Sequence, residues 1–259
     1  MGRLPLAGRT IVVTRPAAQA DGLCAALAGL GAEALRFPLL TITPVHDPAA
    51  YAALHARLRA GDFSLAFFVS PNAVHCALDG LLPHGPLPAT LQLSTVGKGS
   101  EAALAARGFE QVIAPESGFD SESVLALPAF QPAAVAGRRV LILRGDGGRD
   151  LLGDTLAQRG AQVEYFSCYR RSGPVDDPAP LLARARARGL DALSLTSSEA
   201  VGHLLALPGV EVLFPVPVFA PHPRIVHAAR KAGFHQVIPT EAADRGLLDG
   251  LLAHFSRDA

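Results

Sequence analysis

Two apolar segments of the chain each end in a short polar turn whose side chains could bind an anion. The segments are LAFFVSPNAVHCAL, residues 65–78, and ALSLTSSEAVGHLL, residues 192–205. The hydroxyl and amide side chains of these turns belong to Ser70, Asn72, Ser197 and Ser198. Such residues commonly cap a helix, and the free backbone N–H groups beside them attract carboxylates. Capping is the commoner role for any one such turn, and the recurrence of the turn adds weight to a ligand site.

Two arginines follow other apolar segments at matching positions, Arg15 after IVVT and Arg144 after VLIL. A guanidinium can hold a carboxylate through two parallel hydrogen bonds. Arg144 opens the glycine-rich stretch RGDGGRD, which also carries Arg149 and fits neither GxGxxG nor GxxxxGK[ST]. The stretch therefore indicates a carboxylate-binding turn, and a tight turn with solvated arginines is the equal alternative.

Two further turns, in VGKGSEAAL and APHPRIVHAA, carry polar side chains at expected helix starts. We expect Ser100 to open a helix in the first, and His222 and Arg224 to stand at the corresponding turn in the second. Backbone N–H groups at such turns suit anions. His222 and His227 are five residues apart, which does not align two metal ligands on a helix, so we expect no metal site.

Tyr169 ends the strand-like VEYFSCY immediately before two arginines. Its phenol could donate a hydrogen bond to a reacting group, or the residue could simply anchor a linker as an amphipathic side chain. No nucleophile, base and orienting acid stand together in a known catalytic spacing.

An internal repeat explains why these turns occur in pairs. Three pairs of segments align in the same order along the chain: 8–40 with 137–169, 65–78 with 192–205, and 106–115 with 231–240. Each copy reads as short apolar strands alternating with amphipathic helices, a pattern typical of parallel sheets covered on both faces. We predict an α/β protein of two flavodoxin-like halves.

Glycines and prolines mark the expected ends of these elements. Gly31 and Gly160 occupy matching positions where a helix C-cap is expected. The proline-rich stretches 41–48 and 171–180 are expected to be linkers.

The composition narrows the class of partner. The 259 residues carry 23 Lys plus Arg and 23 Asp plus Glu, so no overall basic field would attract nucleic acid. No apolar run reaches the roughly 20 residues of a membrane helix, and no export signal is evident. The three cysteines are widely spaced, as in a protein of the reducing cytosol. We expect a cytoplasmic protein that binds neither nucleic acid nor membrane.

Taken together, these motifs resemble the uroporphyrinogen-III synthase family over nearly the whole chain. The resemblance is carried by VVTRP, FFVSPNAV, STVGKGSEAALAARGF, LILRGDGGRDLL, GAQVEYFSCYRR, LTSSEAV and PHPRIVHAARKAGF. It implies two flavodoxin-like parallel-sheet domains joined by a two-stranded linker, with the active-site cleft between them. Residues 1–38 with 171–259 then form one domain, and residues 39–170 form the inserted one. The repeat alone equally allows two consecutive halves divided near residue 135.

The resemblance also implies a reaction, the cyclisation of hydroxymethylbilane to uroporphyrinogen III. Water is lost, and the last pyrrole ring is inverted through a spiro intermediate. Tyr169 matches the family's tyrosine proposed to help the water leave. Ser70, Ser100 and Ser197 fall on hydroxyl-bearing binding positions, with Asn72 nearby, whereas Pro223, beside His222 and Arg224, departs from the hydroxyls that the family often has there.

The implied enzyme is a cytoplasmic monomer without cofactor or metal. Its partners are the linear tetrapyrrole substrate and, in transient contact, hydroxymethylbilane synthase. Two alternatives remain open at this point. A non-enzymatic two-domain α/β protein could bind a small acidic ligand with the same architecture, and a nucleotide-dependent enzyme could use RGDGGRD as its phosphate loop.

Overall fold

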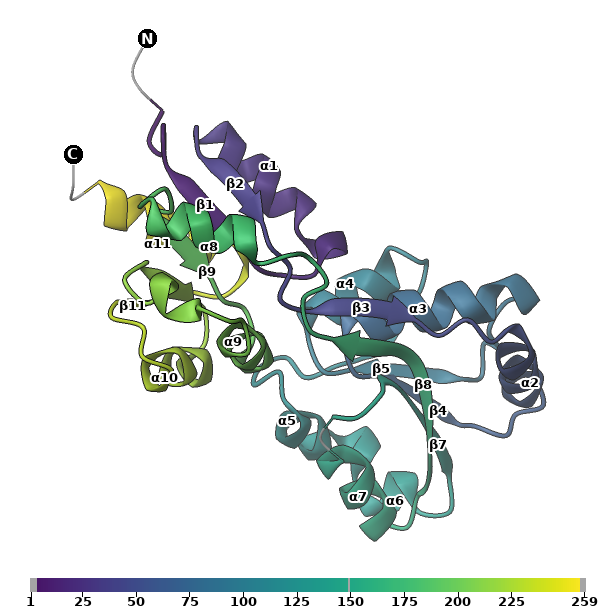
Figure 1. Ribbon diagram of the computed structural model, residues 1–259. Helices are drawn as coiled ribbons and strands as arrows, with labels where there is room; N and C mark the ends of the chain where they lie inside the picture. Colours follow the sequence, from purple (N-terminus) through teal and green to yellow (C-terminus); the bar gives the residue numbers. More distant parts are fainter. Residues whose placement is uncertain (1–3, 149, 257–259) are drawn as a thin grey trace. The chain divides into compact units, whose positions relative to one another are not determined.

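The computed structural model describes residues 4–148 and 150–256, so Arg149 lies outside the described residues. The chain forms two compact units (Figure 1). The first unit comprises residues 1–41 and 172–259, and the second comprises residues 42–171. The chain passes between the units within β3 (Thr41–Pro44) and at the end of β8 (Gln162–Ser172), which are neighbours in one sheet. The proline-rich stretches expected as linkers therefore contribute residues to strands.

The first unit is a five-stranded sheet in the order β2-β1-β9-β10-β11, and neighbouring strands in it run parallel. Its strands are β1 (Thr10–Val13), β2 (Glu33–Arg36), β9 (Ala192–Ser194), β10 (Val218–Ala220) and β11 (Val237–Pro239). Its helices are α1 (Asp21–Gly29), α8 (Ala179–Arg186), α9 (Ser198–Leu205), α10 (Pro223–Lys231) and α11 (Ala243–Phe255).

The second unit is built on a six-stranded sheet in the order β3-β8-β7-β4-β5-β6, parallel from β8 to β6. Its other strands are β4 (Leu65–Phe68), β5 (Gln92–Thr95), β6 (Val112–Ile113) and β7 (Arg139–Gly145). Its helices are α2 (Pro48–Arg59), α3 (Pro71–Leu81), α4 (Lys98–Ala105), α5 (Ser121–Ala126), α6 (Pro132–Val135) and α7 (Leu151–Gln158).

Strands that the internal repeat aligns occupy the same positions in the two sheets. In the first unit, chain order runs 2-1-3-4-5 across the sheet, which is the flavodoxin-like order. In the second unit, β7, β8, β4, β5 and β6 take the same places, although the first two of them come last in the chain. The predicted α/β fold with parallel sheets in two units is confirmed.

The strands are apolar throughout because helices cover both faces of each sheet. Side chains alternate between the faces, so Val12 of β1 packs with α8, α9 and α10, while Ile11 and Val13 pack with α1 and α11. In β4, Phe68 packs on the side of α2, α3 and α4, and Phe67 on the side of α5, α6 and α7. This double burial replaces the polar–apolar alternation of a half-exposed strand.

Helix ends follow the predicted chemistry with one exception. Gly31 and Gly160 follow α1 and α7 with φ of +90° and +88°, a left-handed conformation that costs glycine little. Ser70 and Ser197 are the N-caps of α3 and α9. The expectation that Ser100 opens its helix is wrong, because α4 begins at Lys98 with Gly97 as its N-cap.

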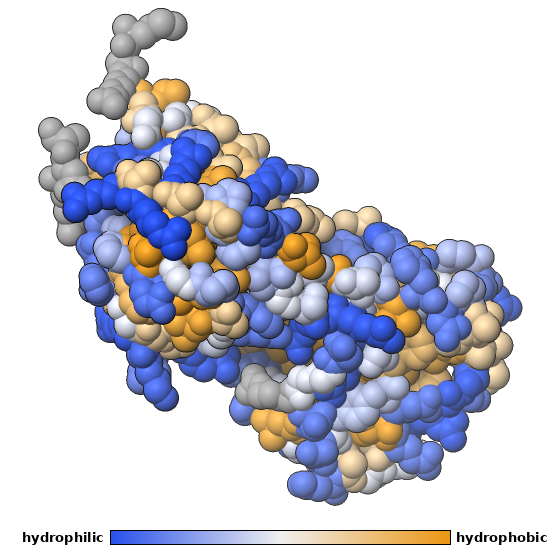
Figure 2. All heavy atoms as spheres, viewed as in Figure 1, coloured by the Kyte–Doolittle hydropathy of each residue, from blue (hydrophilic) through white to orange (hydrophobic). Residues whose placement is uncertain are grey.

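On the face shown in Figure 2, hydrophilic residues cover much of the surface of both units, and hydrophobic residues form smaller groups among the hydrophilic ones. Within residues 4–148 and 150–256, no helix combines the length and apolar character needed to cross a membrane. Over the same residues, no group of three or more His, Cys, Asp or Glu side chains is arranged to hold a metal ion.

Candidate functional site

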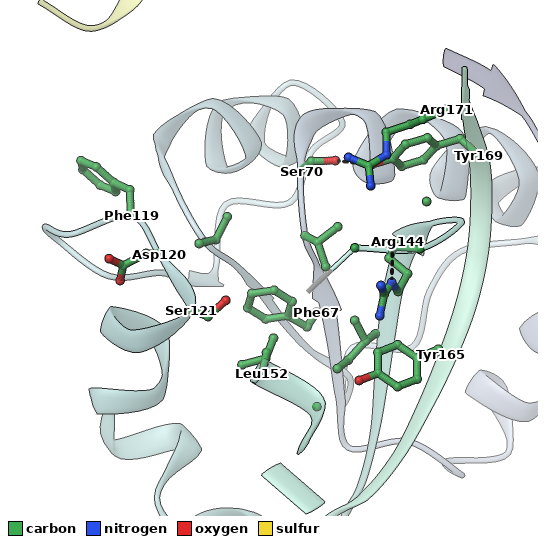
Figure 3. Close-up of a pocket in the computed structure, with 17 residues that line it drawn as sticks. Phe67, Ser70, Phe119, Asp120, Ser121, Arg144, Leu152, Tyr165, Tyr169 and Arg171 are labelled. Carbon is green, nitrogen blue, oxygen red and sulfur yellow. Dashed lines mark hydrogen bonds between the residues drawn. The ribbon is translucent and has the colours of Figure 1, made fainter. Parts of the chain in front are cut away.

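A pocket of about 280 Å³ lies at the carboxyl ends of β4, β7 and β8 in the second unit (Figure 3). Here the strand order reverses, since the chain moves outward from β4 to β5 and from β7 to β8. Ligands of open α/β sheets gather at such a point because adjacent connections leave it in opposite directions. Ser70, Arg144 and Tyr169, three residues predicted from the sequence, line this pocket together.

Ser70 and Tyr169 meet inside the pocket although they are 99 residues apart. Their hydroxyl oxygens lie 3.1 Å apart, and either can donate the hydrogen. Ser70 Oγ also accepts the backbone N–H of Ala73 at 3.2 Å and so caps α3. The cap fixes Ser70 Oγ, and Ser70 Oγ in turn fixes the end of the Tyr169 side chain.

Tyr169 is held in its neutral form. The residue is only 4% exposed, and this burial raises the pKa of its phenol above the usual value near 10. The hydrogen bond with Ser70 and the positive charge of Arg171 oppose that rise in pKa without cancelling it. At neutral pH the phenol therefore keeps its hydrogen and can donate it to a hydrogen bond.

A β-bulge in β8 directs Tyr169 into the pocket. Arg144 of β7 pairs with Ser167 of β8, but the next residue, Gly145, pairs with Tyr169, so Cys168 is left over. Cys168 Sγ lies 3.2 Å from the carbonyl oxygen of Arg144, and burial raises the pKa of this thiol to about 12. Cys168 and Tyr169 both pack in the apolar cluster on the side of α2, α3 and α4, whereas successive residues of a regular strand point to opposite faces.

Arg144 is engaged by the turn that follows it. Its Nε donates to the carbonyl oxygen of Gly147 at 3.1 Å, and Nη1 donates to Asp150 at 2.7 Å. The guanidinium also lies over the ring of Tyr165, with its carbon 4.9 Å from the ring centre. Arg144 thus presents a buried, oriented positive charge to the pocket, with part of its hydrogen-bonding capacity already used.

Several pocket residues were not predicted from the sequence. Figure 3 shows Arg171 beside Tyr169, whereas Phe119, Asp120 and Ser121 lie at the opposite side of the pocket. The alternation of β8 could have identified Arg171, because residues two apart on a strand share a face. The turn at Phe119 offered no such signal, since its place depends on the fold of the whole unit.

The first unit has a pocket at the carboxyl ends of β1, β9 and β10, with a volume of about 300 Å³. It is lined by Arg15, whose Nη1 donates to Asp244 Oδ1 of α11 at 2.5 Å. Ser197 Oγ caps α9 by accepting the N–H of Ala200 at 3.0 Å, and Ser198 is exposed. Arg15 and Arg144 are therefore both paired with carboxylates of the chain itself.

The remaining predicted residues occupy helix starts. Asn72 is half-buried in the first turn of α3, and Ser100 is only 2% exposed in the first turn of α4. His222 caps α10, since its Nδ1 accepts the backbone N–H of Arg224 at 3.1 Å, and both residues are exposed. Of the candidates, only Ser70, Arg144 and Tyr169 line the pocket of the second unit.

The pocket combines a neutral phenol donor, the guanidinium groups of Arg144 and Arg171, and the N-terminal end of α3. Cations and helix N-termini both favour anions, and a buried phenol can assist a departing oxygen. The arrangement suits a substrate that carries carboxylates and loses a hydroxyl group.

Comparison with known proteins points to one family. The family model described as "Uroporphyrinogen-III synthase HemD" matches residues 21–249. The uroporphyrinogen-III synthase of Salmonella typhimurium is 33% identical over 245 residues, which cover 92% of this chain and 98% of that protein. That of Escherichia coli is 35% identical over 199 residues, 76% of this chain and 79% of that protein.

Solved structures show the same fold at lower sequence identity. A mutant uroporphyrinogen III synthase of Thermus thermophilus superimposes with a TM-score of 0.62 at 19% identity, covering 97% of this chain and 99% of that one. The uroporphyrinogen-III synthetase of Helicobacter pylori superimposes with a TM-score of 0.58 at 13% identity, covering 95% and 99%.

Proposed function

The chain belongs to the uroporphyrinogen-III synthase family, and we propose that it cyclises hydroxymethylbilane to uroporphyrinogen III with Tyr169 as hydrogen-bond donor. The observation that carries this assignment is the buried neutral phenol of Tyr169, fixed 3.1 Å from Ser70 Oγ in a pocket with two arginines. A cyclising lyase needs no redox partner, and a phenol donor meets its first requirement, which is loss of water.

The reaction begins with cleavage of the bond between carbon and oxygen of the hydroxymethyl group. Ser70 Oγ accepts the N–H of Ala73 and is free to donate to Tyr169 Oη, which leaves the phenol hydrogen for the departing oxygen. The phenol proton passes to that oxygen, which leaves as water, so an azafulvenium cation remains on the first ring and Tyr169 becomes a phenolate. The phenolate recovers a proton when the last ring loses the hydrogen of its unsubstituted carbon on final closure. Because burial raises the pKa of Tyr169, the donor is protonated in the neutral range before each turnover.

The following steps depend mainly on geometry. The substituted carbon of the last ring attacks the cation, and the resulting spiro intermediate fragments and recloses at the other position. Unguided bilane also closes in water, but without inversion, so the protein must favour the spiro transition state over direct closure. A rigid pocket that fixes the folded substrate can supply this preference without a catalytic triad.

The acetate and propionate groups of the substrate require many anion contacts. In this proposal they are bound by Arg144 and Ser70 of the second unit and by further residues at helix starts and strand ends. These further residues are Arg15, Asn72, Ser100, Ser197, Ser198, His222 and Arg224. The position of these residues supports a role in carboxylate binding, because free N–H groups and the positive ends of helix dipoles lie at helix starts. Arg171 is added to the set because it lines the pocket beside Tyr169.

The cellular setting follows from the same proposal. The enzyme acts in the cytoplasm as a monomer without cofactor, and receives its linear tetrapyrrole in transient contact with hydroxymethylbilane synthase. The balanced charge of the chain, 23 basic and 23 acidic residues, supports a small-molecule substrate over a polyanion.

The Tyr169→Phe variant tests the assignment because it removes one hydroxyl and keeps the buried ring. We expect turnover of fresh hydroxymethylbilane to fall by about 10²-fold, within the usual range for a general acid, with unchanged circular dichroism. Unchanged kinetics would exclude Tyr169 as the donor. A wild-type protein that binds hydroxymethylbilane without accelerating its closure would instead identify a binding protein.

A further inference from the structure

We propose that Gly145 is a positioning residue for Tyr169, and that the absence of a side chain at Gly145, opposite the β8 bulge, determines where the phenol lies. The inference rests on the proposed function, since it concerns the hydrogen-bond donor of that reaction. Gly145 ends β7, lines the pocket, and pairs in register with Tyr169 after the bulge at Cys168.

The ring of Tyr169 occupies the space that a side chain at position 145 would need. A Cβ atom on Gly145 would lie 2.6 Å from Cε2, 2.8 Å from Cζ and 3.1 Å from Cδ2 of the Tyr169 ring. Carbon atoms in contact normally stay about 3.5–4.0 Å apart, so the ring would have to retreat by about 1 Å. The backbone of Gly145 is not in the left-handed region, and the three atoms nearest to the added Cβ all belong to the Tyr169 ring.

The ring has little freedom to retreat without losing its hydrogen bond. Tyr169 belongs to the apolar cluster that also contains Val74 and Cys168, and its Oη is fixed by Ser70 Oγ. The backbone of β8 is held at the bulge by Cys168 Sγ, which lies 3.2 Å from the carbonyl oxygen of Arg144. Displacement therefore moves Oη away from Ser70.

Gly153 offers a matched control in the same pocket. A Cβ atom there would meet a different tyrosine, at 1.8 Å from Oη and 2.7 Å from Cζ of Tyr165. Tyr165 is 40% exposed, so its side chain can swing toward solvent, which the 4% exposed Tyr169 cannot do as easily. Gly153→Ala is thus expected to displace Tyr165 and leave the hydrogen bond between Tyr169 and Ser70 in place.

The kinetic experiment compares Gly145→Ala, Tyr169→Phe and the double variant on fresh hydroxymethylbilane. Misplacing a reacting group by about 1 Å can cost about 10²-fold in rate, so we expect Gly145→Ala to lower kcat by that factor with little change in KM. In the Tyr169→Phe background, Gly145→Ala should lower kcat no further. An equal loss in both backgrounds would overturn the inference, because Gly145 would then act without the Tyr169 hydroxyl.

A spectroscopic readout separates this inference from the proposed reaction. In protein labelled with ¹³C at tyrosine Cζ, the pKa of Tyr169 should lie above the usual value near 10. It should rise further in Gly145→Ala, because the displaced phenol stays buried and loses the hydrogen bond with Ser70 that lowers its pKa. Gly153→Ala should shift the Tyr165 resonance instead. If Tyr169→Phe retains full turnover, Tyr169 is not the hydrogen-bond donor of the reaction. The Tyr169 resonance in Gly145→Ala still tests whether Gly145 positions the phenol. An unchanged Tyr169 pKa in Gly145→Ala would contradict that role.

A variant that fails to fold is also informative. Should Gly145→Ala be unfolded, combining it with Tyr169→Leu removes the ring that the new methyl group meets. A folded double variant supports the proposed contact, whereas a double variant that stays unfolded overturns it.

Discussion

Replacing Ser70 with alanine removes two contacts made by one oxygen. Ser70 Oγ accepts the N–H of Ala73 at 3.2 Å, which caps α3, and it lies 3.1 Å from Tyr169 Oη. The lost cap costs about 1 kcal/mol, and the lost hydrogen bond to a buried phenol costs about 1 kcal/mol more. We therefore expect the free energy of unfolding of Ser70→Ala to fall by about 2 kcal/mol.

Asp47→Ala is the control that removes a cap alone. Asp47 Oδ1 accepts the N–H of Ala50 at 2.9 Å at the exposed start of α2, in the same unit. This variant should lose about 1 kcal/mol and keep the wild-type turnover. The hydrogen bond with Ser70 lowers the pKa of Tyr169, so only Ser70→Ala should raise that pKa further.

The assay is urea denaturation of both variants, with turnover and the tyrosine titration measured on the same preparations. Ser70→Ala should be less stable than Asp47→Ala and should turn over more slowly. Equal stability losses in the two variants, together with an unchanged Tyr169 pKa in Ser70→Ala, would show that the hydrogen bond between Ser70 and Tyr169 contributes nothing.

Two further predictions concern stability. Gly80→Ala should destabilise the protein by about 1–3 kcal/mol in urea denaturation, because a Cβ there would lie 2.4 Å from the ring of buried Tyr51. Gly202→Ala, whose Cβ would have nothing within 4 Å, should stabilise the protein by up to about 1 kcal/mol. A gain in stability in Gly80→Ala would contradict the packing described. The hydrogen bonds from Arg57 lower the pKa of Glu164, so their contribution is present above the usual carboxyl pKa and is lost as pH falls through the lowered value. Because both side chains are more than a third exposed, Glu164→Gln should remove only about 0.5 kcal/mol at pH 7 and less at pH 3, and an equal loss at both pH values would refute the ion pair.

The repeat made much of the fold predictable. Aligned segments predicted aligned strands, and β1, β2 and β9 indeed occupy the same places in their sheet as β7, β8 and β4. Local chemistry also marked Ser70, Asn72, Ser197 and Ser198 as possible caps, and of these Ser70 and Ser197 are the N-caps of α3 and α9. The repeat did not determine how the chain divides between the two units, and the resemblance to a known family was needed for that expectation.

Contacts between distant segments were beyond sequence reasoning. The hydrogen bond between Ser70 and Tyr169 depends on the β8 bulge, and no pattern in VEYFSCY marks Cys168 as the extra residue. The pairing of Arg15 with Asp244, which are 229 residues apart, likewise depends on where α11 packs. From the sequence, Arg15 and Arg144 were both expected to be able to bind a carboxylate of a ligand. In the fold, each forms an ion pair with an aspartate of the chain itself.

The most direct measurement of the proposed function is the porphyrin isomer formed from fresh hydroxymethylbilane. Purified protein and buffer alone are compared, and the products are oxidised and resolved by chromatography. We expect the protein to yield the type III isomer, in which the last ring is inverted, while buffer yields the uninverted type I isomer. Type I alone in the presence of folded protein would refute the proposed function.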